Sequence, residues 1–287
     1  MNGASALILL AGMLTSPGDT LVDVQEGEQL VLRDFGGTVV LESWTRPVIR
    51  AEVDSKEAPN FQVSRSGNRV ELRMPGGRTP VSGEDFRLTI PQWMDVEISG
   101  KEVEVEVYDV SGDVTVRNFR GDLFFQDLSG SVDAYTAEGS IEGYGLTGTA
   151  HLQTGEDEIV VVHSTAILDL ETVDGDIRLE GMESRRISVR TTDGEIEFSG
   201  RVLEGGDYGF YSHGGDIQIR LAEPVDLDAR VLAYGGEFQS DFPVRTKGFR
   251  SGESLDFTLG SGGARMVVET FDGEVSLLRG SSGTREQ

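Results

Sequence analysis

The sequence predicts an all-β fold, a single-stranded parallel β-solenoid (β-helix) with about 18–21 residues in each coil. Between Gly112 and Phe198 a bend recurs about every nine residues, and apolar and polar residues alternate after each bend. This alternation indicates a strand with one buried face, and glycine suits the turn before it. Aromatic residues make up only 7% of the chain while glycine occurs 38 times, as a thin core with many bends requires.

The chain begins with an apolar stretch, which we interpret as part of a signal peptide covering residues 1–18. Ala4–Leu14 has about the length of a signal-peptide core, and Thr15-Ser16-Pro17-Gly18 supplies the small and helix-breaking residues that follow one. Met1-Asn2-Gly3 lacks the usual positive charge, so a buried first strand is the alternative. Once this segment is removed, no stretch of the chain is apolar enough to predict a membrane span.

Residues 20–110 are expected to form an irregular β start that caps the solenoid, because an uncovered strand edge recruits other strands. A polar loop from Pro75 to Gly83 is the clearest internal break. The strand-like stretches of this region are Gln29 to Arg33, Thr38 to Glu42, Val48 to Val53, Arg69 to Met74 and Phe86 to Ile90.

Residues 111–280 carry the regular repeats, two units of which would make one coil. A period of nine does not fit the six-residue left-handed helix, and the glycine-rich turn of calcium-binding nonapeptide repeats is missing. After Phe198 the spacing loosens, Asp241 to Glu253 is expected to protrude as a loop, and residues 281–287 read as a disordered tail. The apolar residues predicted to face inward include Val114, Val116, Ile141, Ile159, Ile177, Leu179, Ile196 and Ile217.

The charge balance excludes one class of partner. The chain has 50 acidic and 25 basic residues, a formal net charge of −25, and such a surface repels nucleic acid and anionic lipid headgroups. It contains no cysteine, so disulfides, thiolate metal sites and a cysteine nucleophile are excluded as well.

Several short motifs follow one another in the order of a known family. They are Arg33-Asp34-Phe35-Gly36-Gly37-Thr38-Val39, Trp44, Arg87-Leu88-Thr89-Ile90-Pro91, Val96-Glu97-Ile98, Ser111-Gly112-Asp113-Val114, Asp174-Gly175-Asp176-Ile177 and Phe271-Asp272-Gly273-Glu274-Val275. On these motifs, residues 25–279 resemble the bacterial family labelled "putative adhesin". The resemblance implies an exported or envelope-associated β-solenoid, and the family has no established catalytic residues to carry over.

No catalytic constellation stands out, so no catalytic or cofactor-binding residue is assigned. The three histidines are not paired at metal-ligand spacing; His151 should point outward, and His163 and His213 fall in bends. No Gly-x-Ser-x-Gly elbow or phosphate loop is present. A solenoid enzyme that cleaves polysaccharide remains the alternative, because it would need only two carboxylates in a groove. Tyr208 to Tyr211 is expected to pack between coils, with glycan or protein contact as the alternative.

The position after the bend glycine is often acidic, which predicts a column of side chains along one edge. If alternate units stack, the column contains Asp122, Ser140, Glu158, Asp176, Glu195, Asp216 and Glu237. Neighbours would lie about 5 Å apart, where like charges repel by roughly 1 kcal/mol in water. We interpret the acids mainly as caps of nearby bend amides. The sharper hypothesis is a weak calcium site formed by Glu158, Asp176, Glu195, Asp216 and Glu237.

These features together predict a non-catalytic, exported, adhesin-like solenoid with a structural or binding role in the cell envelope. Its location would be the periplasm or the cell surface, and its partner an envelope protein or a glycan.

Overall fold

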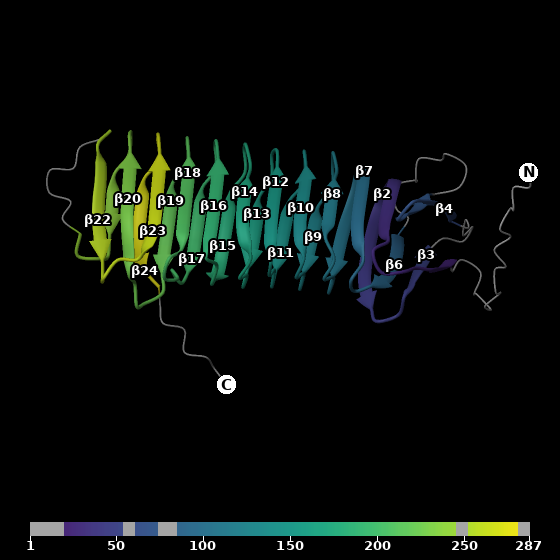
Figure 1. The fold of residues 1–287 in the computed structure, drawn as a ribbon. Helices are drawn as coiled ribbons and strands as arrows, with labels where there is room; N and C mark the ends of the chain where they lie inside the picture. The colour runs from purple at the N-terminus through teal and green to yellow at the C-terminus, as the bar shows by residue number, and fades with distance from the viewer. Residues whose placement is uncertain (1–19, 54–60, 74–84, 245–251, 281–287) are drawn as a thin grey trace, which may run out of the picture.

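The alternating units form strands that wind into a long β-solenoid (Figure 1). The computed structural model describes residues 20–53, 61–73, 85–244 and 252–280, and every regular element within them is a strand. The expected signal peptide, the Pro75–Gly83 loop, the tail at 281–287 and part of the Asp241–Glu253 loop lie outside these residues. The predicted fold class is confirmed.

The middle of the molecule consists of coils with two strands each, one in each of two parallel sheets. Successive coils are offset by 18 residues from Val114 to Val132 to Ala150, and later offsets between equivalent strands reach 21 residues, as between Ile187 and Tyr208. We call the sheets face A and face B. Face A contains β8 (Val114–Arg117), β10 (Ser131–Thr136), β12 (Thr149–Thr154), β14 (Ile167–Glu171), β16 (Arg186–Thr191) and β18 (Asp207–Ser212). Face B contains β9 (Leu123–Gln126), β11 (Ile141–Tyr144), β13 (Ile159–Val162), β15 (Ile177–Met182), β17 (Ile196–Gly200) and β19 (Ile217–Leu221).

The inward rows of the two faces fill the space between them with apolar side chains. Burial of one such side chain contributes about 1.5–3 kcal/mol, and the core is continuous along the stack. Every residue predicted to face inward is buried, with at most 1% of its surface exposed: Val114, Val116, Ile141, Ile159, Ile177, Leu179, Ile196 and Ile217.

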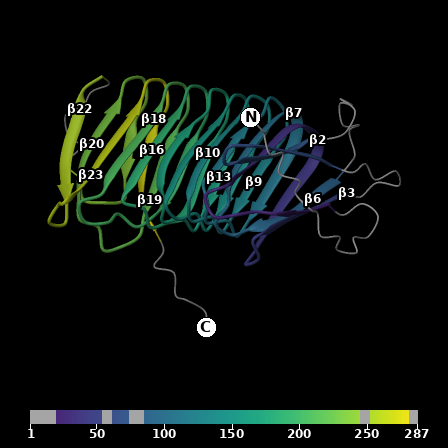
Figure 2. The same ribbon diagram turned by 45° about the vertical axis from the view of Figure 1, so that its right-hand side comes forward.

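A column of buried hydroxyl groups lies at the bends that follow the face A strands β10 to β18 and the later strand Ala264–Thr270. Thr136, Thr154, Thr172, Thr191, Ser212 and Thr270 each donate a hydrogen bond to a backbone carbonyl of the adjacent coil, at 2.8–3.3 Å. These bonds satisfy carbonyl groups that the tight bend leaves outside the sheet ladders. At the same bends the coils approach so closely that a Cβ at Gly194 would overlap the carbonyl oxygen of Gly175. Figure 2 shows the bends in a regular row along the edge.

At the N-terminal end, chain order and spatial order differ. The long β7 (Asp95–Tyr108) runs across both faces and pairs with β8 and β9, and β2 (Gln29–Trp44) pairs along β7. The next coil of the chain, β5 (Arg69–Arg73) and β6 (Asp85–Pro91), lies outside β2. Antiparallel strands complete this end: β1 (Thr20–Asp23) on β3 (Val48–Val53), β3 on β6, and β4 (Gln62–Ser66) on β5. Two predicted strands of this region, Gln29 to Arg33 and Thr38 to Glu42, are thus one continuous strand, because β2 spans both faces.

The C-terminal end repeats this exchange. The last coil, β23 (Ala264–Thr270) and β24 (Val275–Arg279), pairs directly with β18 and β19. The preceding coil, β20 (Leu227–Ala233) and β21 (Phe238–Ser240), lies outside it, and β22 (Ser254–Leu259) adds antiparallel to β20. Stacking in chain order, which the sequence repeats predict, is therefore wrong at this end.

Candidate functional site

The acidic edge column exists, with one correction. Backbone hydrogen bonds link the residue after each position to its neighbour, so Glu158, Asp176, Glu195 and Asp216 occupy consecutive coils. Glu237 does not follow Asp216, because the last coil of the chain is inserted there and places Glu274 between them. The side chains of all these residues are exposed.

The aspartates of the column bind backbone amides of the next coil. Asp122 accepts a hydrogen bond from the amide of Ser140 at 2.8 Å and Asp176 from that of Glu195 at 2.8 Å. Asp216 accepts one from the amide of Glu274 at 2.7 Å. Bonds of this kind are those of bend caps. Among the described residues, no group of three or more histidine, cysteine, aspartate or glutamate side chains could hold a metal ion.

The three histidines lie apart from one another. His151 points outward from β12, where its Nδ1 lies 3.4 Å from Asp169, and Asp169 also pairs with Arg190. His163 occupies a bend with φ of 51°, and His213 stacks on the exposed ring of Phe271 with 5.0 Å between centroids. The outward position of His151 agrees with the sequence prediction.

The aromatic cluster at Tyr208–Tyr211 belongs mainly to the core. Tyr208 and Phe210 are fully buried, and the Tyr208 hydroxyl donates to the carbonyl of Ser184 at 2.8 Å and accepts from the amide of Leu203 at 2.8 Å. Burial raises the pKa of Tyr208. Packing between coils, the interpretation preferred from the sequence, describes these residues.

A different set of aromatic residues faces outward on face B, and the sequence prediction missed it. We call it the aromatic–acidic strip; it consists of Glu106 and Tyr108 on β7, Phe124 and Gln126 on β9, and Glu142 and Tyr144 on β11. Phe124 pairs with a glutamate on each side, and Gln126 pairs with a tyrosine on each side. Each aromatic residue therefore lies beside a carboxylate or an amide in the neighbouring coil. All six side chains are partly exposed.

The rings of the strip form a continuous row. The centroid of Phe124 lies 5.5 Å from that of Tyr108 and 5.4 Å from that of Tyr144. Each tyrosine hydroxyl donates a hydrogen bond to the glutamate two residues before it: Tyr108 to Glu106 at 2.8 Å and Tyr144 to Glu142 at 3.0 Å.

The electrostatic field at the strip is negative. Burial, the bond to Glu106 and the charges of Glu106 and Glu42 raise the pKa of Tyr108. The bond to Glu142, with burial and further glutamates, raises the pKa of Tyr144. The signal that could have found the strip is the 18-residue coil offset applied to outward positions, which aligns Tyr108, Gln126 and Tyr144.

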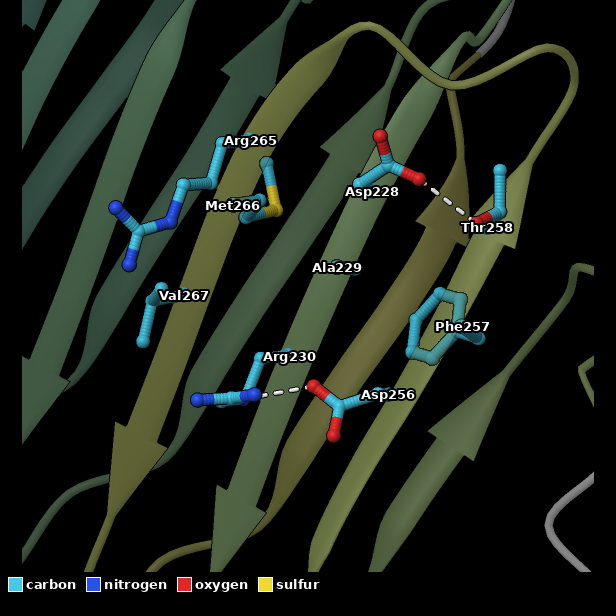
Figure 3. A pocket seen from close by; sticks show the side chains of 9 residues that line it. All are labelled: Asp228, Ala229, Arg230, Asp256, Phe257, Thr258, Arg265, Met266 and Val267. Carbon is cyan, nitrogen blue, oxygen red and sulfur yellow. Dashed lines mark hydrogen bonds and ion pairs between the residues drawn. The ribbon is translucent and has the colours of Figure 1, made fainter.

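Two hollows on the outer faces are lined by charged side chains, several of which bind one another. One of about 400 Å³ lies over β20, β22 and β23 (Figure 3). There Arg230 pairs with Asp256 at 2.7 Å, and Thr258 donates to Asp228 at 2.7 Å. A second, also about 400 Å³, lies on face B, where Arg178 pairs with Glu197 at 3.1 Å.

Among the described residues, the pKa is shifted at two carboxyl groups, and both shifts are opposite to that of a glycosidase general acid, whose pKa is raised. The amide and hydroxyl of Ser261 lower the pKa of Asp226, and a hydrogen bond from Arg73 lowers that of Glu71. Both shifts favour the ionised form, which accepts hydrogen bonds and donates no proton.

Comparisons with known proteins place the chain in a family. Residues 38–278 match the family described as Toastrack DUF4097, and the chain belongs to it, which confirms the resemblance indicated by the sequence motifs. A comparison with curated proteins finds no match.

Several crystal structures are similar to this one. A "putative adhesin" from Bacteroides fragilis NCTC 9343 is 12% identical, with a TM-score of 0.47 and coverage of 91% of this chain and 95% of that one. A "putative lipid binding protein" from Parabacteroides distasonis ATCC 8503 is 10% identical, with a TM-score of 0.44 and coverage of 90% and 96%. A "putative adhesin" from Parabacteroides merdae ATCC 43184 is 10% identical, with a TM-score of 0.33 and coverage of 92% and 95%.

Proposed function

We propose that the protein is a non-catalytic, exported solenoid that presents binding surfaces in the cell envelope, in the periplasm or at the cell surface. The observation that carries the proposal is the location of the side chains that a partner could contact. The interior is filled by apolar side chains, so the polar and aromatic groups available to a partner lie on the outer faces and edges.

The shape and the hollows support a binding role. The stacked coils form an elongated body with two outer faces, which suits contact with an extended partner (Figure 1). Both carboxylates of the hollow over β20, β22 and β23 are engaged, Asp256 with Arg230 and Asp228 with Thr258. With both carboxylates held by such contacts, the hollow presents no free carboxylate to act as a general acid or base.

The proposed export rests on the apolar segment at the start of the chain. Among the residues that the structure describes, none forms a helix with the length and apolar character needed to cross a membrane. A fusion to alkaline phosphatase, which is active only outside the cytoplasm, tests export. We expect activity from the native fusion and its loss in Leu9→Arg with Leu10→Arg, because charges abolish the apolar core. Gln25→Arg, outside that segment, is the control. Equal activity of all three fusions, or none in the native one, would contradict signal-dependent export.

The absence of catalysis is tested with envelope polysaccharides. Incubation with purified protein should release no new reducing ends, whereas sedimentation with intact envelope material should show binding. Turnover that one carboxylate substitution abolishes would replace this proposal with the polysaccharide-active enzyme.

A further inference from the structure

The glutamates of the aromatic–acidic strip keep hydrogen-bonding capacity beyond the bonds that they accept from the tyrosines. Each of Glu106 and Glu142 accepts one hydrogen bond from a tyrosine, and a carboxylate has room for several more. The hydroxyl bonds hold the rings of Tyr108 and Tyr144 in place, with Phe124 between them. A partner would therefore meet ordered rings and carboxylates, and little side-chain freedom would be lost on binding.

The strip contains carboxylates and no basic side chain. The basic residues of the neighbouring outward positions on face B are already paired: Arg178 with Glu197 at 3.1 Å and Arg87 with Glu42 at 3.2 Å. Besides burial and the hydrogen bonds, the charges of glutamates on several coils contribute to the raised pKa of both tyrosines. The charge that complements this surface must come from another molecule.

We infer that the aromatic–acidic strip binds an arginine-bearing, extended basic segment of a partner protein. The inference rests on the proposed binding role and names the class of partner. A second copy of this chain fits less well, because face-to-face contact would bring glutamates against glutamates. A neutral glycan could stack on the rings but would leave the carboxylate charges uncompensated.

The spacing of the strip suits an extended segment. Glu106 and Glu142 are two coils apart, a separation of about 10 Å at 4.8 Å per strand. An extended segment in the polyproline II conformation rises about 3.1 Å per residue with three residues per turn, so side chains three residues apart lie on one side and span about 9 Å. Arginine fits better than lysine, because its planar guanidinium both pairs with carboxylates and stacks on rings such as Phe124.

The test measures binding of the purified protein to a fluorescent flexible peptide with an arginine at about every third position. Glu106→Gln with Glu142→Gln should weaken binding about tenfold, because two charge contacts are lost. Glutamine still accepts the tyrosine hydroxyl bonds, so the fold should persist. Glu156→Gln with Asp174→Asn removes two exposed charges from a bend edge, and this matched control should change the affinity less than about twofold.

Two further measurements sharpen the test. A peptide with lysine in place of each arginine should bind more weakly. Phe124→Leu should reduce the ratio of the affinities for the arginine and lysine peptides about threefold, because the stacking contact is lost. Binding should fall steeply between about 50 and 300 mM salt.

Several results would overturn the inference. If the strip double variant and the control double variant weakened binding equally, the peptide would be attracted only by the net charge of the protein. If the native protein did not bind the peptide, the proposed site would be ruled out. If a neutral polysaccharide bound the protein independently of salt, and the strip variants impaired that binding, the face would be a glycan-binding surface. If the protein self-associated and the strip variants abolished this, the face would be a dimer interface. Loss of the strip site with retained export and envelope sedimentation would leave the proposed function standing.

Discussion

The middle of the solenoid and its two ends use the same strand pattern but order their coils differently. From β8 to β17 each coil pairs with the coils before and after it in the chain. At each end, the terminal coil lies one place inside its neighbour: β2 between β7 and β5/β6, and β23/β24 between β18/β19 and β20/β21.

The difference shows how the ends of an open stack limit the exposure of unpaired strand edges. A parallel solenoid has an exposed strand edge at each end, which can recruit other chains. Here β2 and the last coil, β23 and β24, are paired on both sides, while the outer positions carry antiparallel additions such as β4 and β22. Separation of the last coil must therefore open two ladders for each of its strands.

The largest effect is expected from breaking the middle of the stack. Ile177→Asp places a carboxylate in the core, and we expect it to cost at least about 4 kcal/mol and to unfold several coils together. Circular dichroism and thermal melting measure this. Val160→Asp makes a comparable apolar-to-acid change at an outward position one coil away and should cost less than about 1 kcal/mol. Similar losses in both variants would contradict the inward and outward assignment.

The inserted C-terminal coil is tested next. Leu277→Ala should cost about 2–4 kcal/mol although it lies near the end of the chain, because β24 is held between β19 and β21. Leu278→Ala, the outward neighbour on the same strand, should cost less than about 1 kcal/mol in the same urea titration. If Leu277→Ala proves as mild as Leu278→Ala, the last coil frays and the inserted order is wrong.

A smaller effect is expected at the hydroxyl column. Thr154→Val keeps the side-chain shape but leaves the carbonyl of Gly139 without its 2.8 Å bond, at a cost of about 1–2 kcal/mol. Thr154→Ser retains the hydroxyl and should be the milder change. The reverse ranking in thermal melts would show that the methyl group, and not the hydrogen bond, stabilises this bend.

The smallest effect concerns the acidic edge column. Calcium at millimolar levels and a sodium control of equal ionic strength should raise the melting temperature alike, because screening acts in both and Asp176 is engaged as a bend cap. An additional rise with calcium that disappears in Asp176→Asn with Glu195→Gln would instead establish a cation-binding column.

The sequence by itself determined the middle of this protein. A glycine bend followed by alternating apolar residues is local information, and a strand buried on one face has only one register that keeps Ile141, Ile159 and Ile177 inside. The coil length, the inward row and the outward position of His151 were therefore predictable.

Only the tertiary structure decided the order of coils at the ends, the hydroxyl column and the aromatic–acidic strip. Coil order depends on which edges pair: the chain passes over one position between β19 and β20, and it returns past β20 between β22 and β23. Thr136 and Thr154 continue the inward phase of Ala134 and Leu152, but the carbonyl groups that their hydroxyls bond belong to the adjacent coil and are known only from the stack. Tyr108, Phe124 and Tyr144 are separated in sequence and become neighbours only when the coils stack.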